Sequence, residues 1–165
     1  MRTPLTIAAL TALALAGGCG SDGDSADSAE KASKPAGGPP PKELLGSYTT
    51  TLTPGDVPSN PPPELASGSK SWKLTISSAG GPDGAPAFTI ANAQLGPLES
   101  SSLRVKGDRL LLREVCAAGG NVRFYRNEYS YRLSGKRLTL REVKNRCPDD
   151  VALTILTSHP WTKGS

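Results

Sequence analysis

Three cysteines, one histidine and several glutamates are the residues of this chain best suited to covalent or acid–base chemistry. Cys19 stands between an apolar run and a small, acidic run, in "LALAGGCGSDGDS" over residues 13–25. The residues before it have the order of a secretory signal peptide: basic Arg2, an apolar stretch over 5–16, then small residues. Because a transmembrane helix needs about 20 apolar residues, this shorter run predicts export and cleavage, with an uncleaved anchor or another cleavage position as the alternatives.

The other two cysteines, Cys116 and Cys147, follow much later in the chain. In an exported protein a disulfide between them is the expected state, and two free buried thiols are the alternative. No metal site is expected, because His159 is the only histidine and the chain has no Cys-x-x-Cys pair.

Catalytic chemistry is not expected. His159 lies in "SHPW" near the end of the chain, where a surface position is expected, with no sign of a nucleophile and an orienting acid for a triad. Three glutamates have the chemistry to act as acid and base inside a barrel, but pairing with neighbouring arginines on or near the surface is the preferred interpretation. These glutamates are Glu114, Glu128 and Glu142, and the neighbours are Arg113, Arg126 and Arg141. No Gly-rich phosphate loop is present, so neither an enzyme nor a cofactor is expected.

The elements that would position these residues begin after a tether. Residues 20–42 contain no aromatic residue and no Leu, Ile or Val, so they cannot bury enough apolar area to offset chain entropy. The sequence therefore predicts a signal peptide over 1–18, Cys19 with a disordered linker over 19–42, and one domain over 43–165.

Charge is uneven along that domain. Residues 104–146 carry twelve Lys or Arg against four Asp or Glu, whereas residues 43–103 carry two against five. Such a basic half suits nucleic acid, acidic glycans or anionic lipid headgroups, but the solvated outer face of a sheet is the preferred interpretation. Export also argues against a nucleic-acid partner.

Eight segments have the composition and boundaries of strands. They are 47–53, 70–77, 86–92, 102–106, 109–115, 122–133, 136–143 and 151–157. Several alternate strictly: Trp72, Leu74 and Ile76 share one face, and Val151, Leu153 and Ile155 do the same. This pattern is typical of antiparallel strands with one buried face.

Short turns join most of these strands, at Gly107-Asp108 and Ser134-Gly135 for example, which favours an up-and-down meander. Eight strands close into a small barrel, so the predicted fold is all-β, an eight-stranded antiparallel up-and-down barrel. A change of apolar phase predicts a bulge near Phe124–Tyr125. The proline-rich link over 54–69 is expected to hold one helical turn at "PPELAS" and to act as a lid over one end. An immunoglobulin-like sandwich is disfavoured, because no Trp lies between Cys116 and Cys147.

The segment "LAGGC" resembles the lipobox of bacterial lipoproteins, with Ala16 where the usual Leu stands. The resemblance implies that Cys19 becomes the first residue and carries a diacylglycerol. Multiple acyl chains hold a protein stably to a membrane. The expected location is the extracytoplasmic face of the cell membrane.

The domain resembles the lipocalin or calycin superfamily, in particular small lipid-anchored lipocalin-like proteins of actinobacteria. The matching pieces are "GSY" at 46–48, "SWKLTI" at 71–76, "GDRLLL" at 107–112, "YSYRL" at 129–133, "KRLTL" at 136–140 and "CPDDVALTILTSHPW" at 147–161. "GSY" stands where the superfamily has Gly-x-Trp, with Tyr48 in place of Trp. Arg141 and Lys163 are the candidates for the late arginine that many lipocalins stack over that Trp.

This resemblance implies a monomeric barrel that binds a small apolar ligand. The candidate lining residues, which serve equally well as plain core, are Tyr48, Trp72, Ile76, Phe88, Tyr125, Tyr129 and Tyr131. The alternative is a cell-surface protein-binding or inhibitor module with a filled barrel, whose contact surface would be the loops at 117–121 and 145–150. A cavity above about 300 Å³ would favour the ligand, and a filled barrel with exposed apolar residues the partner.

Overall fold

The computed structural model describes residues 37–66, 70–118, 121–147 and 150–164. The predicted signal peptide, Cys19 and most of the predicted linker lie outside these residues. Among the described residues no helix is long and apolar enough to cross a membrane.

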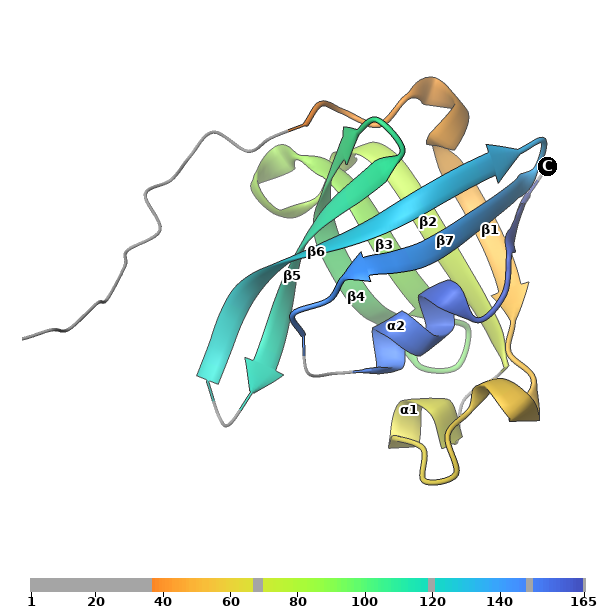
Figure 1. Ribbon diagram of the computed structural model, residues 1–165. Helices are drawn as coiled ribbons and strands as arrows, with labels where there is room; N and C mark the ends of the chain where they lie inside the picture. Colours follow the sequence, from red (N-terminus) through yellow and green to blue (C-terminus); the bar gives the residue numbers. More distant parts are fainter. Residues whose placement is uncertain (1–36, 67–69, 119–120, 148–149, 165) are drawn as a thin grey trace, which may run out of the picture. The chain divides into compact units, whose positions relative to one another are not determined.

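The described chain forms a closed eight-stranded antiparallel barrel in which each strand pairs with the next and β8 pairs with β1 (Figure 1). The strands are β1 Gly46–Thr51, β2 Ser71–Gly80, β3 Pro86–Asn92, β4 Gly96–Lys106, β5 Arg109–Ala118, β6 Asn121–Ser134, β7 Arg137–Lys144 and β8 Trp161–Lys163. Helical segments are η1 Lys42–Leu44, η2 Pro54–Asp56, α1 Pro63–Ala66, η3 Pro82–Gly84 and α2 Asp150–Thr157. The predicted up-and-down barrel is confirmed.

Period-two alternation accounts for the barrel core. Trp72, Leu74 and Ile76 of β2 point inward and are buried, while Lys73 between them is exposed. The same alternation buries Leu110 and Leu112 on β5 and Leu138 and Leu140 on β7. Each strand therefore contributes one apolar row to a single shared core.

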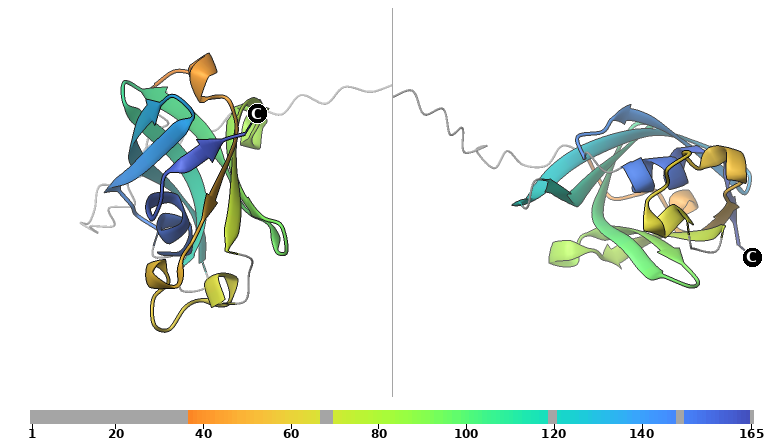
Figure 2. Two further views of the ribbon diagram at one scale, coloured as in Figure 1. Left: turned by 90° about the vertical axis from the view of Figure 1, so that its right-hand side faces the viewer. Right: turned by 90° about the horizontal axis from the view of Figure 1, so that it is seen from below.

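The predicted strand over 151–157 is wrong, because this segment forms helix α2. Val151 and Ile155 lie one helical turn apart and both are buried, as is Leu156. Helix α2 thereby packs its apolar stripe onto the core at one end of the barrel (Figures 1 and 2). Closure falls instead to the three residues of β8, where Thr162 pairs with both Thr49 and Arg137.

The predicted bulge near Phe124–Tyr125 is also wrong. The register between β5 and β6 runs without interruption from Arg109–Ser130 to Ala118–Asn121. The irregularity lies between β6 and β7, at Glu128/Tyr129. The apparent phase change arises because Phe124 points outward and is 60% exposed, so it does not belong to the core row.

The link between β1 and β2 lies at the same end of the barrel as α2 (Figure 2). It contains the predicted helical turn, which is α1, and Leu65 of α1 packs against the core. His159 Nε2 lies 2.7 Å from Asp56 Oδ2, which connects this link to the segment after α2.

Candidate functional site

At the other end of the barrel from α2, Tyr48 and Lys163 form a contact that closes the core. Their Cα atoms are partners in the β1–β8 register, and Lys163 Nζ lies 5.5 Å from the centroid of the Tyr48 ring. Lys163 Nζ also donates to the carbonyl oxygen of Glu43 at 2.7 Å, and the Tyr48 hydroxyl donates to that of Leu44 at 2.9 Å. These bonds hold η1 over the barrel end, and Leu44, the last residue of η1, is fully buried there.

Gly46 is needed for this arrangement. Its φ is +135°, in a region that side chains with a Cβ rarely adopt, and a Cβ there would lie 2.9 Å from Lys163 Cε. The glycine of "GSY" therefore lets the lysine pass close to the start of β1. The other candidate for this role, Arg141, is exposed on β7.

Most of the predicted lining residues form a packed interior. Tyr48, Trp72, Ile76, Phe88 and Tyr129 are all 2% exposed or less and belong to one contiguous core. Tyr125 and Tyr131 are half-buried, and Tyr131 packs against the same core. Burial raises the pKa of the Tyr48 hydroxyl. The structure thus brings the predicted set together, but as mutual packing partners.

A polar cluster interrupts this apolar interior between β4, β5 and β6. Glu114 is almost fully buried, and the side-chain amide of Asn127 donates to its Oε2. On β4, Ser101 donates to Glu99 Oε1 at 2.7 Å. Cys147 Sγ lies 3.6 Å from Glu114 Oε2, so the segment after β7 completes the cluster.

Burial is the main reason that the pKa of Glu114 rises, to about 8, and the negative charge of nearby Glu99 adds to the effect. Oε1 of Glu114 is buried and accepts no hydrogen bond from a side-chain or backbone donor. A proton held between Glu114 and Glu99 supplies one, which is a further reason for the raised pKa. Burial and the surrounding carboxylates also raise the pKa of Tyr129.

The preferred interpretation of Glu114 as a surface residue paired with arginine is wrong, since its side chain points inward. The alternation of "LLLREV" carried the signal, because Glu114 is in phase with buried Leu110 and Leu112. Of the other two glutamates, Glu142 is exposed and Glu128 is half-buried on the outer face. The three therefore do not meet as an acid–base set.

His159 is partly exposed. Its contact with Asp56 supplies two members of a catalytic triad, the histidine and the acid, but not a nucleophile. The Thr53 hydroxyl donates to Asp56 at 2.7 Å and not to the histidine. This hydrogen bond is the main reason that the pKa of Asp56 is lowered. Among the described residues no group of three His, Cys, Asp or Glu side chains is placed to hold a metal ion.

The predicted disulfide stays a prediction, because the Cys116 side chain lies outside the described side chains. The backbone of Cys116 lies within β5, opposite Arg123, and not past its end as expected. Cys147 follows β7 and is half-buried. Of the two predicted contact loops, residues 119–120 and 148–149 are not described.

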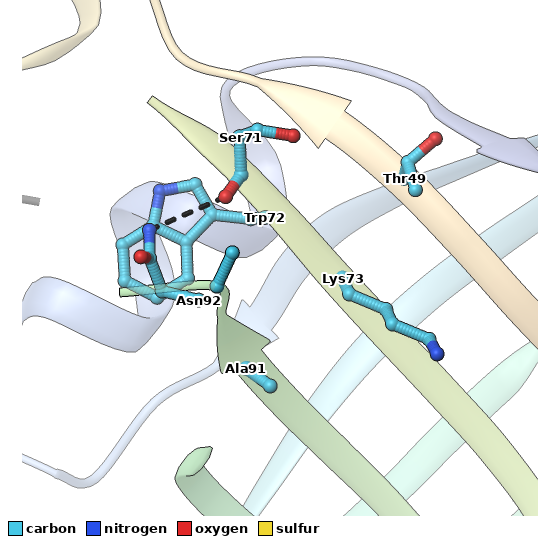
Figure 3. A pocket seen from close by; sticks show the side chains of 7 residues that line it. Thr49, Ser71, Trp72, Lys73, Ala91 and Asn92 are labelled. Atoms are coloured by element: carbon cyan, nitrogen blue, oxygen red, sulfur yellow. Dashed lines mark hydrogen bonds between the residues drawn. The ribbon is translucent and has the colours of Figure 1, made fainter. Parts of the chain in front are cut away.

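One hollow lies on the outer surface, over β1, β2 and β3 (Figure 3). Its volume is about 170 Å³, and residues such as Thr49, Lys73 and Ala91 line it. The side-chain amide of Asn92 donates to the Ser71 carbonyl oxygen at 3.2 Å beside it. This hollow is smaller than a typical site for a drug-sized ligand and faces away from the core.

Comparison with known proteins gives no relative. No protein-family model matches the chain, and no curated protein or solved structure matches it. The arguments that follow therefore start from this chain's own residues.

Proposed function

We propose that this protein is an exported, lipid-anchored, lipocalin-like protein that acts as a cell-surface binding module through the outer surface of a filled barrel. It is proposed to be non-catalytic and monomeric, and to stand on the extracytoplasmic face of the membrane through Cys19. This is a broader form of the second function expected from the sequence, a protein-binding or inhibitor module with a filled barrel, and the packing of the interior favours it over the first.

The observation that carries the proposal is the occupied interior. Large side chains that include Trp72, Phe88 and Tyr129 meet in the middle of the barrel with almost no exposure. Leu44 covers one end, and Leu156 of α2 is buried at the other. Since close-packed interiors leave little space, the surface is the better place for recognition.

The lipocalin-like part of the proposal is supported by the end that η1 closes. Gly46 and Tyr48 stand where the superfamily has Gly-x-Trp, and Lys163 lies over the Tyr48 ring as the late arginine does over that Trp. Of the two candidates for that arginine, the geometry favours Lys163.

The anchor rests on the sequence alone, on the apolar leader and the lipobox-like "LAGGC". Its test is fractionation of cells that express the full chain or Cys19→Ser. We expect the wild-type chain in the membrane fraction with a mass increased by the lipid, and the variant without that mass. An unmodified Cys19 in the wild-type protein would contradict the anchor.

A small apolar ligand inside the barrel is the second candidate, and the polar cluster favours it. Glu114 Oε1 is buried, and a hydrogen-bond donor on a ligand would satisfy it in place of the proton held between Glu114 and Glu99. Such a ligand would have to displace part of the packed core or α2.

Native mass spectrometry of the full chain purified from its own host separates the two candidates. We expect the mass of the lipidated polypeptide with no additional non-covalent mass. A retained small molecule that is lost on Trp72→Ala or Glu114→Ala, but kept on Lys73→Ala at the outer hollow, would establish the interior ligand and overturn the filled-barrel proposal.

A further inference from the structure

The outer face of β4–β7 gathers the basic residues that the sequence distributes over 104–146. One row crosses all four strands, because Lys106 pairs with Arg109, Arg109 with Ser130, and Ser130 with Arg141. Three of these four residues are basic. Arg109 also has a local ion pair with Asp108 in the adjoining turn, at 3.6 Å.

Two further rows lie beside the first. In one, Ser102 pairs with Arg113 and Arg113 with Arg126. In the other, Arg104 pairs with Leu111 and Leu111 with Glu128. Glu128 is the acidic residue among the members of these three rows. We call the surface formed by the three rows the basic face.

This arrangement brings like charges together. Like charges directly opposite each other in neighbouring strands destabilise a sheet, and the basic face contains two such pairs, Lys106–Arg109 and Arg113–Arg126. A face that served only solubility would be expected to mix the two signs. Strands β1, β2 and β3 together contain a single basic residue, Lys73, whereas β4–β7 contain ten, so the positive charge is concentrated on one side.

An exposed aromatic residue lies beside the basic face. Phe124 is 60% exposed, and the guanidinium carbon of Arg113 lies 4.1 Å from the centroid of its ring. It belongs to the β5–β6 hairpin, which extends beyond the rest of the barrel (Figure 1). An aromatic side chain surrounded by basic residues is the composition of surfaces that sit at the boundary of headgroups and acyl chains.

The chain also enters the domain beside this face. Gly38 and Val105 exchange two backbone hydrogen bonds of 2.9 Å, which attach the N-terminal segment to the edge of β4. Val105 lies between Arg104 and Lys106, so Gly38 lies at the border of the basic face.

We propose that the basic face, with Phe124, docks onto an anionic phospholipid surface. The guanidinium group of arginine donates paired hydrogen bonds to lipid phosphate oxygens, and the attractions of several basic residues to a charged membrane add up. The inference rests on the proposed function and names a partner for its outer surface. It does not require the lipid on Cys19. It predicts that the domain lies against the membrane and does not stand away from it.

The test uses the full chain with Cys19→Ser, purified without lipid, and sedimentation with two kinds of vesicle. We expect binding to vesicles that mix phosphatidylglycerol into phosphatidylcholine and none to phosphatidylcholine alone. Raising salt from ~0.1 to ~1 M shortens the screening length from about 10 to 3 Å and should weaken the binding strongly. Equal binding to both vesicles would overturn the inference.

Three outward arginines provide the variant. Arg113→Gln, Arg126→Gln and Arg141→Gln together should lower the vesicle partition coefficient about a hundredfold, since each charge near the surface contributes roughly a factor of five. The matched control is Lys70→Gln with Lys73→Gln, which removes the exposed charge of Lys73 on β2 and that of Lys70 just before this strand. This control should lower the partition coefficient by much less. An equal loss in both variants would show non-specific attraction and overturn the docking surface.

Folding is checked separately by thermal unfolding of each variant. Should the triple variant fail to fold, Arg141→Gln alone is expected to weaken binding about fivefold, and Phe124→Ser to weaken the part of the binding that survives high salt. Binding to a soluble polyanion with no binding to anionic vesicles would overturn the membrane as partner. That result would not contradict the proposed function, a binding module with a filled barrel. Only a small molecule retained in mass spectrometry would overturn that function.

Discussion

Lys163 Nζ lies over the ring of Tyr48, 5.5 Å from its centroid, and joins the last strand of the barrel to the first. The same ammonium group donates to the Glu43 carbonyl oxygen in the segment that covers the barrel end. One side chain near the C-terminus thus supports both the closure of the sheet and the cover over it. This relationship makes the end of the chain important for stability, although β8 has only three residues.

Replacing Lys163 by Ala should destabilise the barrel by about 1–2 kcal/mol, as a cation–π contact and a hydrogen bond from a charged donor are lost together. Lys163→Arg should retain most of the stability, because guanidinium also stacks on aromatic rings. Urea unfolding followed by tryptophan fluorescence measures both. Arg141→Ala, at the exposed alternative position, is the control and should change stability by less than about 0.5 kcal/mol. A larger effect at Arg141 than at Lys163 would contradict this assignment.

Gly46→Ala should also destabilise the fold, by roughly 1–3 kcal/mol, because alanine at a φ of +135° is strained. The short approach to Lys163 Cε adds less, since that atom is part of a flexible side chain. Combining Gly46→Ala with Lys163→Ala should therefore relieve little of the cost. Thermal unfolding of the two single variants and the double variant measures this. A double variant as stable as Lys163→Ala alone would mean that crowding, and not backbone strain, is the cause.

How far the sequence predicts the fold depends on whether tertiary contacts agree with the local pattern. Alternation located the core rows of β2, β5 and β7 because their outward residues are polar. It failed over 151–157, where Val, Leu and Ile at every second position also fit a helix that buries Val151, Ile155 and Leu156. Thr154 and Thr157, both β-branched, favoured a strand on propensity alone, and packing at the barrel end overrode that preference.

The candidate site shows the same limit. The pattern of β5 placed Glu114 inside, but its charge argued for the surface, because ionised carboxyl groups are rarely buried. What the local sequence lacks is the partner: Glu99 lies on another strand and Asn127 on a third, so the environment that stabilises a protonated carboxyl appears only in the closed barrel. The excess of basic residues over 104–146 could be counted from the sequence, but the rows that these residues form depend on strand register.

The raised pKa of Glu114 predicts that stability falls as pH rises. An unfolded glutamate loses its proton near pH 4.5, whereas the folded protein keeps it until about pH 8. Between these values the folded state binds more protons, so the free energy of unfolding decreases, by at most about 1.4 kcal/mol per pH unit. Urea unfolding from pH 4.5 to 8 should show this slope. Glu114→Gln should flatten it and be more stable than the wild type near pH 8.

The matched control for that experiment is Glu142→Gln, on the exposed part of β7. It should leave the slope nearly unchanged, because an exposed carboxyl has similar surroundings in the folded and unfolded chain. The same pH dependence in Glu114→Gln and in the wild type would show that another group is responsible.

The Cys116–Cys147 disulfide is a prediction that chemistry can settle directly. Strands β5 and β7 run in the same direction, so Cys116 near the end of one and Cys147 after the other are at the same end of the barrel. A bridge there would close a loop of about thirty residues and contribute roughly 3–4 kcal/mol on the chain-entropy account. Peptide mapping of the exported protein without reductant should find the two cysteines linked, and Cys116→Ser with Cys147→Ser should unfold at lower urea. Reductant should destabilise the wild type and leave that double variant unchanged. Two freely alkylated thiols in the folded, exported protein would exclude the bridge.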